Sequence, residues 1–80
     1  MNEEQRELTF GEKAVGLTFN PSGNPEVNAC KAAFAAVIDQ MHDLRNSTRS
    51  NPEIARMCSI AITEAQTAQM WAVKAITWKN

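Results

Sequence analysis

Residues 59–78, SIAITEAQTAQMWAVKAITW, decide the fold of this chain. Only Glu64 and Lys74 are charged in this stretch, and alanine, the best helix former, recurs through it. We therefore expect one long helix. Small residues form a line along one side of it: Cys58, Ala61, Ala65, Ala68, Ala72 and Ala75. This line would let another helix approach closely, either within the molecule or from a neighbouring copy.

The same helix carries two further apolar faces. One consists of Met57, Ile60, Trp71 and Trp78, and the other of Ile62, Val73 and Ile76. An amphipathic stripe covers roughly a third of the circumference of a helix, so one partner helix cannot cover three faces. We therefore expect a homo-oligomer of helical hairpins in which the tryptophan face is buried between subunits. A tetramer or a hexamer would suffice, and periodicity does not choose between them.

The length and composition of the chain predict a single all-α domain over residues 1–80. The 80 residues include no tyrosine and only three glycines, and 44% of them are hydrophobic, which favours helices over a sheet. A chain this short buries a modest fraction of its surface, so disulfides, a metal or oligomerisation usually stabilise it further.

The triplet Asn-Pro-Glu occurs twice, at residues 24–26 and 51–53, and predicts the starts of two long helices. Asn can cap a helix, Pro suits the first helical position, and Glu complements the positive end of the helix dipole. We expect long helices at 25–45 and 52–78, joined by residues 46–50 into an antiparallel hairpin. Apolar residues of the first long helix recur at spacings of three and four: Val27, Cys30, Phe34, Val37, Ile38, Met41 and Leu44.

The N-terminal part of the chain predicts one short helix. Thr9 and Glu12 form the Thr-x-x-Glu pattern of a capping box. We expect a short helix at 9–16 that ends at Gly16, preceded by a flexible acidic N-terminus at 1–8. The next stretch, FNPSGNPEV, is rich in turn-forming residues.

The charge balance excludes several function classes. Eight basic and nine acidic side chains give a net charge of −1, without the broad positive surface that duplex nucleic acid requires. The acidic start MNEEQRE has no apolar core of signal-peptide length, so secretion is not indicated. Two charges with Gln66 and Gln69 argue against a membrane span at 59–78. A small anionic ligand needs only two or three well-placed cations.

No pattern of residues predicts catalysis or a metal. In an antiparallel hairpin Cys30 and Cys58 would lie roughly a dozen ångströms apart along the axis, at 1.5 Å per residue, which is too far for a disulfide. Free buried thiols in a reducing cytosol are expected instead. His42 is the only histidine, and no second histidine or nearby cysteine completes a ligand set. We expect no enzymatic activity, no metal and no cofactor.

Several features suit an anion that carries an aromatic base. Four cations stand near predicted helix ends, Lys13, Lys31, Arg49 and Arg56, and Phe19 lies beside the first turn. Guanidinium groups and helix N-termini bind phosphates, and an aromatic face can stack on a nucleobase. In most proteins, however, charges such as Lys31 and Arg56 are simply solvated.

Two segments of the chain are similar to a known family. The last helix reads Ser59-x-Ala61-x-Thr63, then Ala68-x-Met70-Trp71-Ala72 and Ala75-Ile76, with Arg56 three residues before Ser59. Upstream stand Phe19-Asn20-Pro21, Gly23 and Val27. Over about residues 19–76 the chain resembles the hairpin family of the phage anti-CBASS protein two and the Thoeris anti-defence protein one.

The resemblance implies a function as well as a fold. It implies a helical hexamer of phage origin in the host bacterial cytoplasm, which sequesters cyclic nucleotide signals without degrading them. Cyclic dinucleotides such as cyclic GMP-AMP would sit between protomers, and cyclic trinucleotides such as cyclic tri-AMP at separate three-fold positions. Two alternatives are sequestration of cyclic ADP-ribose signals of Thoeris defence and a helical oligomeric module that binds another protein.

The resemblance also assigns candidate ligand-binding residues. Phe19 stands where the family usually has tyrosine, often followed by histidine, and would stack on a base. Lys31, the only cation early in the first long helix, and Arg56, which aligns by its spacing to Ser59, would contact phosphate. Thr63, within the matching motif, and Lys13, which could reach a pocket from the short helix or be solvated, complete the set.

Overall fold

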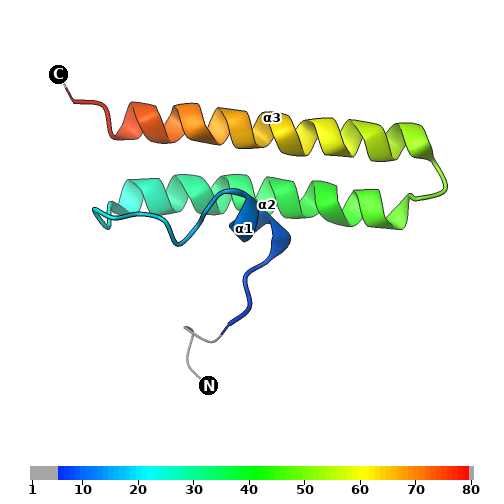
Figure 1. Cartoon of the computed structure of the whole chain (residues 1–80), viewed down its shortest axis with the longest axis horizontal. Coiled ribbons are helices and arrows are strands. Elements are labelled where there is room, and N and C mark those ends of the chain that lie inside the picture. Colours follow the sequence, from blue (N-terminus) through cyan, green and yellow to red (C-terminus); the bar gives the residue numbers. More distant parts are fainter. Residues whose placement is uncertain (1–5, 80) are drawn as a thin grey trace.

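The computed structural model describes residues 6–79, and it is all-helical in that range. A short helix, α1 (Phe10–Ala14), precedes two long ones, α2 (Pro25–Ser47) and α3 (Pro52–Ile76). Figure 1 shows α2 and α3 side by side as an antiparallel hairpin, with α1 crossing the middle of α2. The predicted fold class, a short helix followed by a helical hairpin, is confirmed. Of the N-terminal segment predicted at 1–8, residues 1–5 lie outside the described range.

Both long helices begin at the prolines of the Asn-Pro-Glu triplets. Asn24 Oδ1 accepts hydrogen bonds from the N–H groups of Glu26 and Val27, and Asn51 Oδ1 accepts one from Ile54. These bonds satisfy amide groups that have no partner within the helix. The side chains therefore set where each helix starts.

The ends of the long helices differ slightly from the predicted 45 and 78. Helix α2 continues to Ser47, where the hydroxyls of Ser47 and Thr48 donate to the carbonyl of Leu44. Helix α3 ends at Ile76, and the Thr77 hydroxyl donates back to Val73. The two hydroxyls at the end of α2 thus satisfy the Leu44 carbonyl, whereas the Val73 carbonyl accepts both the Thr77 N–H and the Thr77 hydroxyl.

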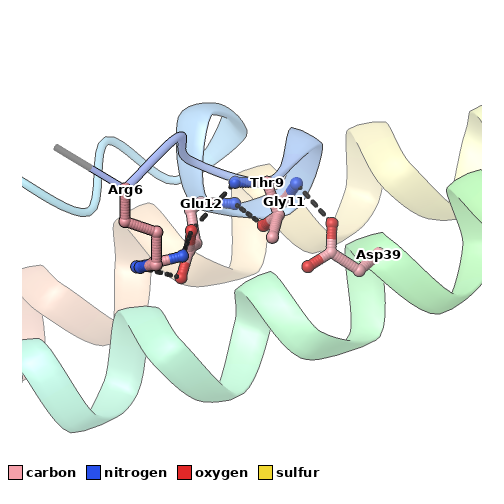
Figure 2. A network of polar contacts seen from close by, with 5 residues as sticks. All are labelled: Arg6, Thr9, Gly11, Glu12 and Asp39. Atoms are coloured by element: carbon pink, nitrogen blue, oxygen red, sulfur yellow. Dashed lines mark hydrogen bonds and ion pairs between the residues drawn. The ribbon is translucent and has the colours of Figure 1, made fainter. Parts of the chain in front are cut away.

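Helix α1 is held by the predicted capping box. Thr9 Oγ1 accepts from the Glu12 N–H at 3.1 Å, and Glu12 Oε1 accepts from the Thr9 N–H at 2.9 Å. Arg6 donates to both carboxylate oxygens of Glu12, at 2.9 and 3.0 Å (Figure 2). Just past its C-terminus the chain turns at Gly16, whose φ of 63° favours glycine.

The core lies where the three helices meet. It is a small cluster of buried side chains, Val15, Ala35, Ile38 and Ile62, of which Ile38 is fully buried. Ala65, from the predicted line of small residues, packs against this cluster from α3. In the middle of the hairpin, the line of small residues and the face of Ile62 therefore pack within the protomer.

The tryptophan face of α3 is not covered within the protomer. Trp71 is 68% exposed, and Met57 and Ile60 on the same helix are exposed as well. Trp78, which was predicted on this face, follows the end of α3 at Ile76 and is 64% exposed. A folded monomer rarely presents so many large apolar side chains together. Within residues 6–79, no helix is long and apolar enough to cross a membrane.

Candidate functional site

A buried lysine lies beneath the loop that connects α1 to α2. Lys31, in the second turn of α2, is only 5% exposed. Its Nζ donates to the carbonyl oxygen of Gly16 at 2.9 Å and to that of Phe19. The same Nζ is 5.6 Å from the centroid of the Phe19 ring, which is itself 73% exposed. Two predicted site residues, Phe19 and Lys31, are thus brought together.

The charge of Lys31 has no anionic partner in the described part of the chain. The ion pairs there join Arg6 to Glu12 and Arg56 to Glu53, and no carboxylate lies within 4.0 Å of Lys31. Buried charges are normally paired because desolvation of an ion is costly. Two carbonyl dipoles satisfy two of the three ammonium hydrogens but leave the net charge uncompensated. An anion bound here would complete the site.

An open hollow of about 440 Å³ lies over this lysine. Val27 and Lys31 of α2, Val73 and Thr77 at the end of α3, and Phe19 are among the residues that line it. Pockets for small molecules and cofactors commonly span 300 to 1,000 Å³, with apolar walls and a few polar groups. The hollow therefore combines an aromatic face, apolar walls and one cation, which suits a base attached to a phosphate.

The loop over the hollow is held by side-chain and backbone hydrogen bonds. Asn20 Nδ2 donates to the Asn24 carbonyl at 2.9 Å and to Asn28 Oδ1 at 2.8 Å, and Asn20 Oδ1 accepts from the Asn24 N–H at 3.3 Å. The Phe19 N–H donates to the Gly16 carbonyl, and the Gly23 N–H to the Asn20 carbonyl. These hydrogen bonds therefore hold the loop in place, and the packing of side chains around Phe19 contributes little to it.

Arg56 lies at the other end of the hairpin. It is in the second turn of α3, roughly 20 Å from Lys31 along the hairpin axis at 1.5 Å per residue. Its guanidinium donates to both oxygens of Glu53, at 3.1 and 2.7 Å, in an exposed pair. This hydrogen bonding lowers the pKa of Glu53 and raises that of Arg56. One protomer therefore does not bring Arg56 to the hollow.

The other two predicted residues also lie outside the hollow. Lys13 is exposed on the last turn of α1, where a cation complements the negative end of the helix dipole. Thr63 is exposed on α3, and its carbonyl accepts from the Thr67 hydroxyl at 3.1 Å. Their roles in ligand binding stay predictions.

Three residues of the site were not predicted as such: Asn20, Val73 and Thr77. Asn20 stands next to Pro21 in a turn-rich stretch, which signals a hydrogen-bonding side chain but not its partners. Val73 and Thr77 reach the hollow because the hairpin places the end of α3 beside the start of α2. To predict Val73 and Thr77, one would need to know which residues of α3 lie opposite which residues of α2.

The remaining reactive side chains have structural neighbours. The His42 ring stacks on Phe10 with centroids 4.1 Å apart and planes 2° apart, and its Nδ1 is 3.1 Å from Arg45 Nη2. Cys30 is half-buried and Cys58 is buried, and both are free thiols. Among residues 6–79, no group of three His, Cys, Asp or Glu side chains is placed to hold a metal.

Residues 12–77 of the chain match the protein-family model described as Acb2/Tad1, hairpin domain. The matched range runs from within α1 to just beyond the end of α3, so it includes Phe19, Lys31 and the whole hairpin. Comparisons with curated proteins and with solved structures found no match.

Proposed function

The chain belongs to the Acb2/Tad1 hairpin domain family, and we propose that it is a sponge for cyclic oligonucleotide second messengers of bacterial CBASS defence. The family implies an anti-defence role of the sponge type. In this proposal the protein binds cyclic dinucleotides such as cyclic GMP-AMP, and also trinucleotides such as cyclic tri-AMP, in the cytoplasm of the phage-infected host. It holds them without degrading them.

The Lys31 ammonium beneath the Phe19 ring, which has no carboxylate partner among the described residues, is the observation that carries this proposal. A phosphate oxygen placed in the hollow would accept the third N–H of Lys31 and compensate its charge. Hydrogen bonds to charged groups contribute about 1.5–3 kcal/mol each. A base attached to that phosphate would stack on Phe19, which contributes about 1–3 kcal/mol for single-stranded nucleic acids.

Assembly would complete the site. The hollow is open on its outer side, and the exposed tryptophan face of α3 would pack against other protomers in a hexamer. Symmetry then multiplies each cation around a ligand with several phosphates, so one or two cations per protomer suffice. Arg56, at the far end of the hairpin, would serve a second class of site, for trinucleotides.

Sequestration requires tight binding and an excess of sites, and it requires no chemical step. Mass action lowers the concentration of free signal below what the host effector needs when this protein binds the signal with a smaller dissociation constant than the effector does. The cation and the aromatic ring that line the hollow, Lys31 and Phe19, are the kind of groups that such binding needs.

A ligand panel tests the proposal directly. Isothermal titration calorimetry with cyclic di- and trinucleotides and with cyclic ADP-ribose isomers should give heat and sub-micromolar affinity for at least one cyclic oligonucleotide. Chromatography of the ligand recovered after denaturation should return it unchanged. Binding of cyclic ADP-ribose isomers alone would assign the protein to Thoeris defence, and no heat with any ligand would overturn the proposal.

A second candidate function follows from the exposed tryptophan face of α3. The same surface could bind another protein, as in a helical interaction module. A stoichiometric protein partner in pull-downs, together with no small ligand in native mass spectra, would favour this function over sequestration.

A further inference from the structure

The side chain of Asn20 fastens the loop before α2 at its second half. Its amide donates to the Asn24 carbonyl and to Asn28 Oδ1, and its carbonyl oxygen accepts the Asn24 N–H. Two donors and one acceptor are therefore used at one terminal group, nearly the full capacity of an asparagine amide. No other residue type of this length offers both donors and an acceptor in this geometry.

Lys31 fastens the first half of the same loop. It holds the carbonyl groups of Gly16 and Phe19 from below. Phe19 thus lies between two anchors, Lys31 on one side and Asn20 on the other. The Phe19 ring is 73% exposed, so side-chain packing does little to hold it.

We propose that Asn20 is a positioning residue: by locking the loop onto the first turns of α2, it holds the Phe19 ring over Lys31 in the orientation that receives a base. Asn20 acts through Phe19. The loop is ordered when the chain folds, so its conformational entropy is lost before the ligand arrives and does not weaken binding. The ligand-binding consequence rests on the proposed function, whereas the locking of the loop does not.

Asn20→Ala tests the lock through amide hydrogen exchange measured by NMR. Exchange of the Phe19, Gly23 and Asn24 amides should rise at least tenfold, while amides in the middle of α2 and α3 stay protected. The nuclear Overhauser contact between the Phe19 ring and the Lys31 side chain should weaken in parallel. A loop that merely contributed to stability would raise exchange throughout the hairpin.

Two further variants sharpen the test. Asn28→Ala removes one acceptor of Asn20, so it should loosen the same amides to a smaller extent and add little to Asn20→Ala in the double variant. Thr18→Ala is the matched control, because Thr18 is an exposed residue of the same loop and makes no side-chain hydrogen bond with the described residues. It should leave exchange unchanged.

Binding is measured on the same samples. Affinity for a cyclic dinucleotide that binds the parent should fall about tenfold in Asn20→Ala, and Phe19→Ala should lose affinity without loosening the loop. Unchanged loop exchange in Asn20→Ala, or a loosened loop with parental affinity, would overturn the inference. If the parent binds no cyclic nucleotide, the proposed function fails. Amide exchange of the loop and the nuclear Overhauser contact between Phe19 and Lys31 still decide whether Asn20 positions Phe19.

Discussion

The backbone N–H of Gly11 donates to the carboxylate of Asp39 at 2.7 Å, and this bond joins α1 to α2 across 28 residues of sequence (Figure 2). The two helices cross so closely here that a Cβ on Gly11 would come within 2.1 Å of the Ala35 carbonyl oxygen. Gly11 is buried in this contact. The absence of a side chain at this position therefore allows α1 to lie on α2 and to cover part of the core.

Gly11→Ala should detach or displace α1. The added methyl group meets backbone, which cannot turn away as a flexible side chain can, and overpacking of this kind costs about 1–3 kcal/mol. Urea unfolding followed by circular dichroism should show the loss. Glu7→Ala, an exposed change just before α1, is the control and should leave the midpoint unchanged. An unchanged midpoint in Gly11→Ala would contradict the close crossing.

Acid should loosen α1 before it unfolds the hairpin. The hydrogen bond from Arg6, and then that from the Thr9 backbone, hold the pKa of Glu12 below its ordinary value of 4.5. A lowered pKa stabilises the fold above the unfolded value, and this contribution is lost as pH falls through the lowered one. Chemical shifts of Thr9 and Glu12 amides should report the change below about pH 4.5. Glu12→Gln should remove this pH dependence.

Lys31→Met should abolish most of the affinity for a phosphate-bearing ligand. The substitution keeps the apolar stem but removes the charge and its hydrogen bonds, so dissociation constants should rise at least tenfold. Calorimetry with the best ligand of the parent measures this change. Arg49→Met, a change of charge at the exposed turn far from the hollow, is the matched control. Equal losses in the two variants would point to a general charge effect.

Arg56→Ala should weaken a phosphate-bearing ligand, with trinucleotides affected most, while the oligomer persists. Glu53→Gln gives the opposite test, because it releases the guanidinium from its bidentate carboxylate partner and should tighten binding. Both are measured by calorimetry beside a mass determination. Parental affinity for every ligand in Arg56→Ala would refute the assignment of this arginine.

Trp71→Ala should disturb assembly first. Trp71 is 68% exposed in the protomer, so its removal should leave the helical content of the hairpin nearly unchanged but weaken contacts between subunits. Light scattering after size-exclusion chromatography should show a smaller mass at low concentration. Glu64→Ala, an exposed polar change on the same helix, should keep the parental mass. A parental mass in Trp71→Ala would place the interface elsewhere.

The fold was predictable because its signals are local. Asn24 and Asn51 cap the helices that their own neighbours form, and Thr9 and Glu12 bond to each other within one turn. Such patterns need no knowledge of the rest of the chain. The exposure of Trp71 was also foreseeable, since counting apolar faces on one helix does not depend on how the loops run.

The site was predictable only in part, because it depends on contacts between distant segments. Phe19 and Lys31 were recognised as candidates, but a lysine early in a helix resembles any solvated charge. Its burial follows from the loop folding back over it, which the sequence does not reveal. The partners of Asn20, and the approach of Val73 to the hollow, are likewise consequences of the three-dimensional register.

If Lys31, which has no carboxylate partner among residues 6–79, binds a phosphate as proposed, the empty and the filled protein should have different lifetimes. A bound phosphate compensates that charge only in the folded state, so capture of a ligand stabilises the fold by RT ln(1 + [L]/Kd). At a ligand concentration a hundredfold above Kd this amounts to about 2.7 kcal/mol. Filled molecules would therefore open less often and resist proteases longer than empty ones. Each captured signal would prolong the survival of the molecule that holds it, and turnover in the host would fall mainly on vacant copies.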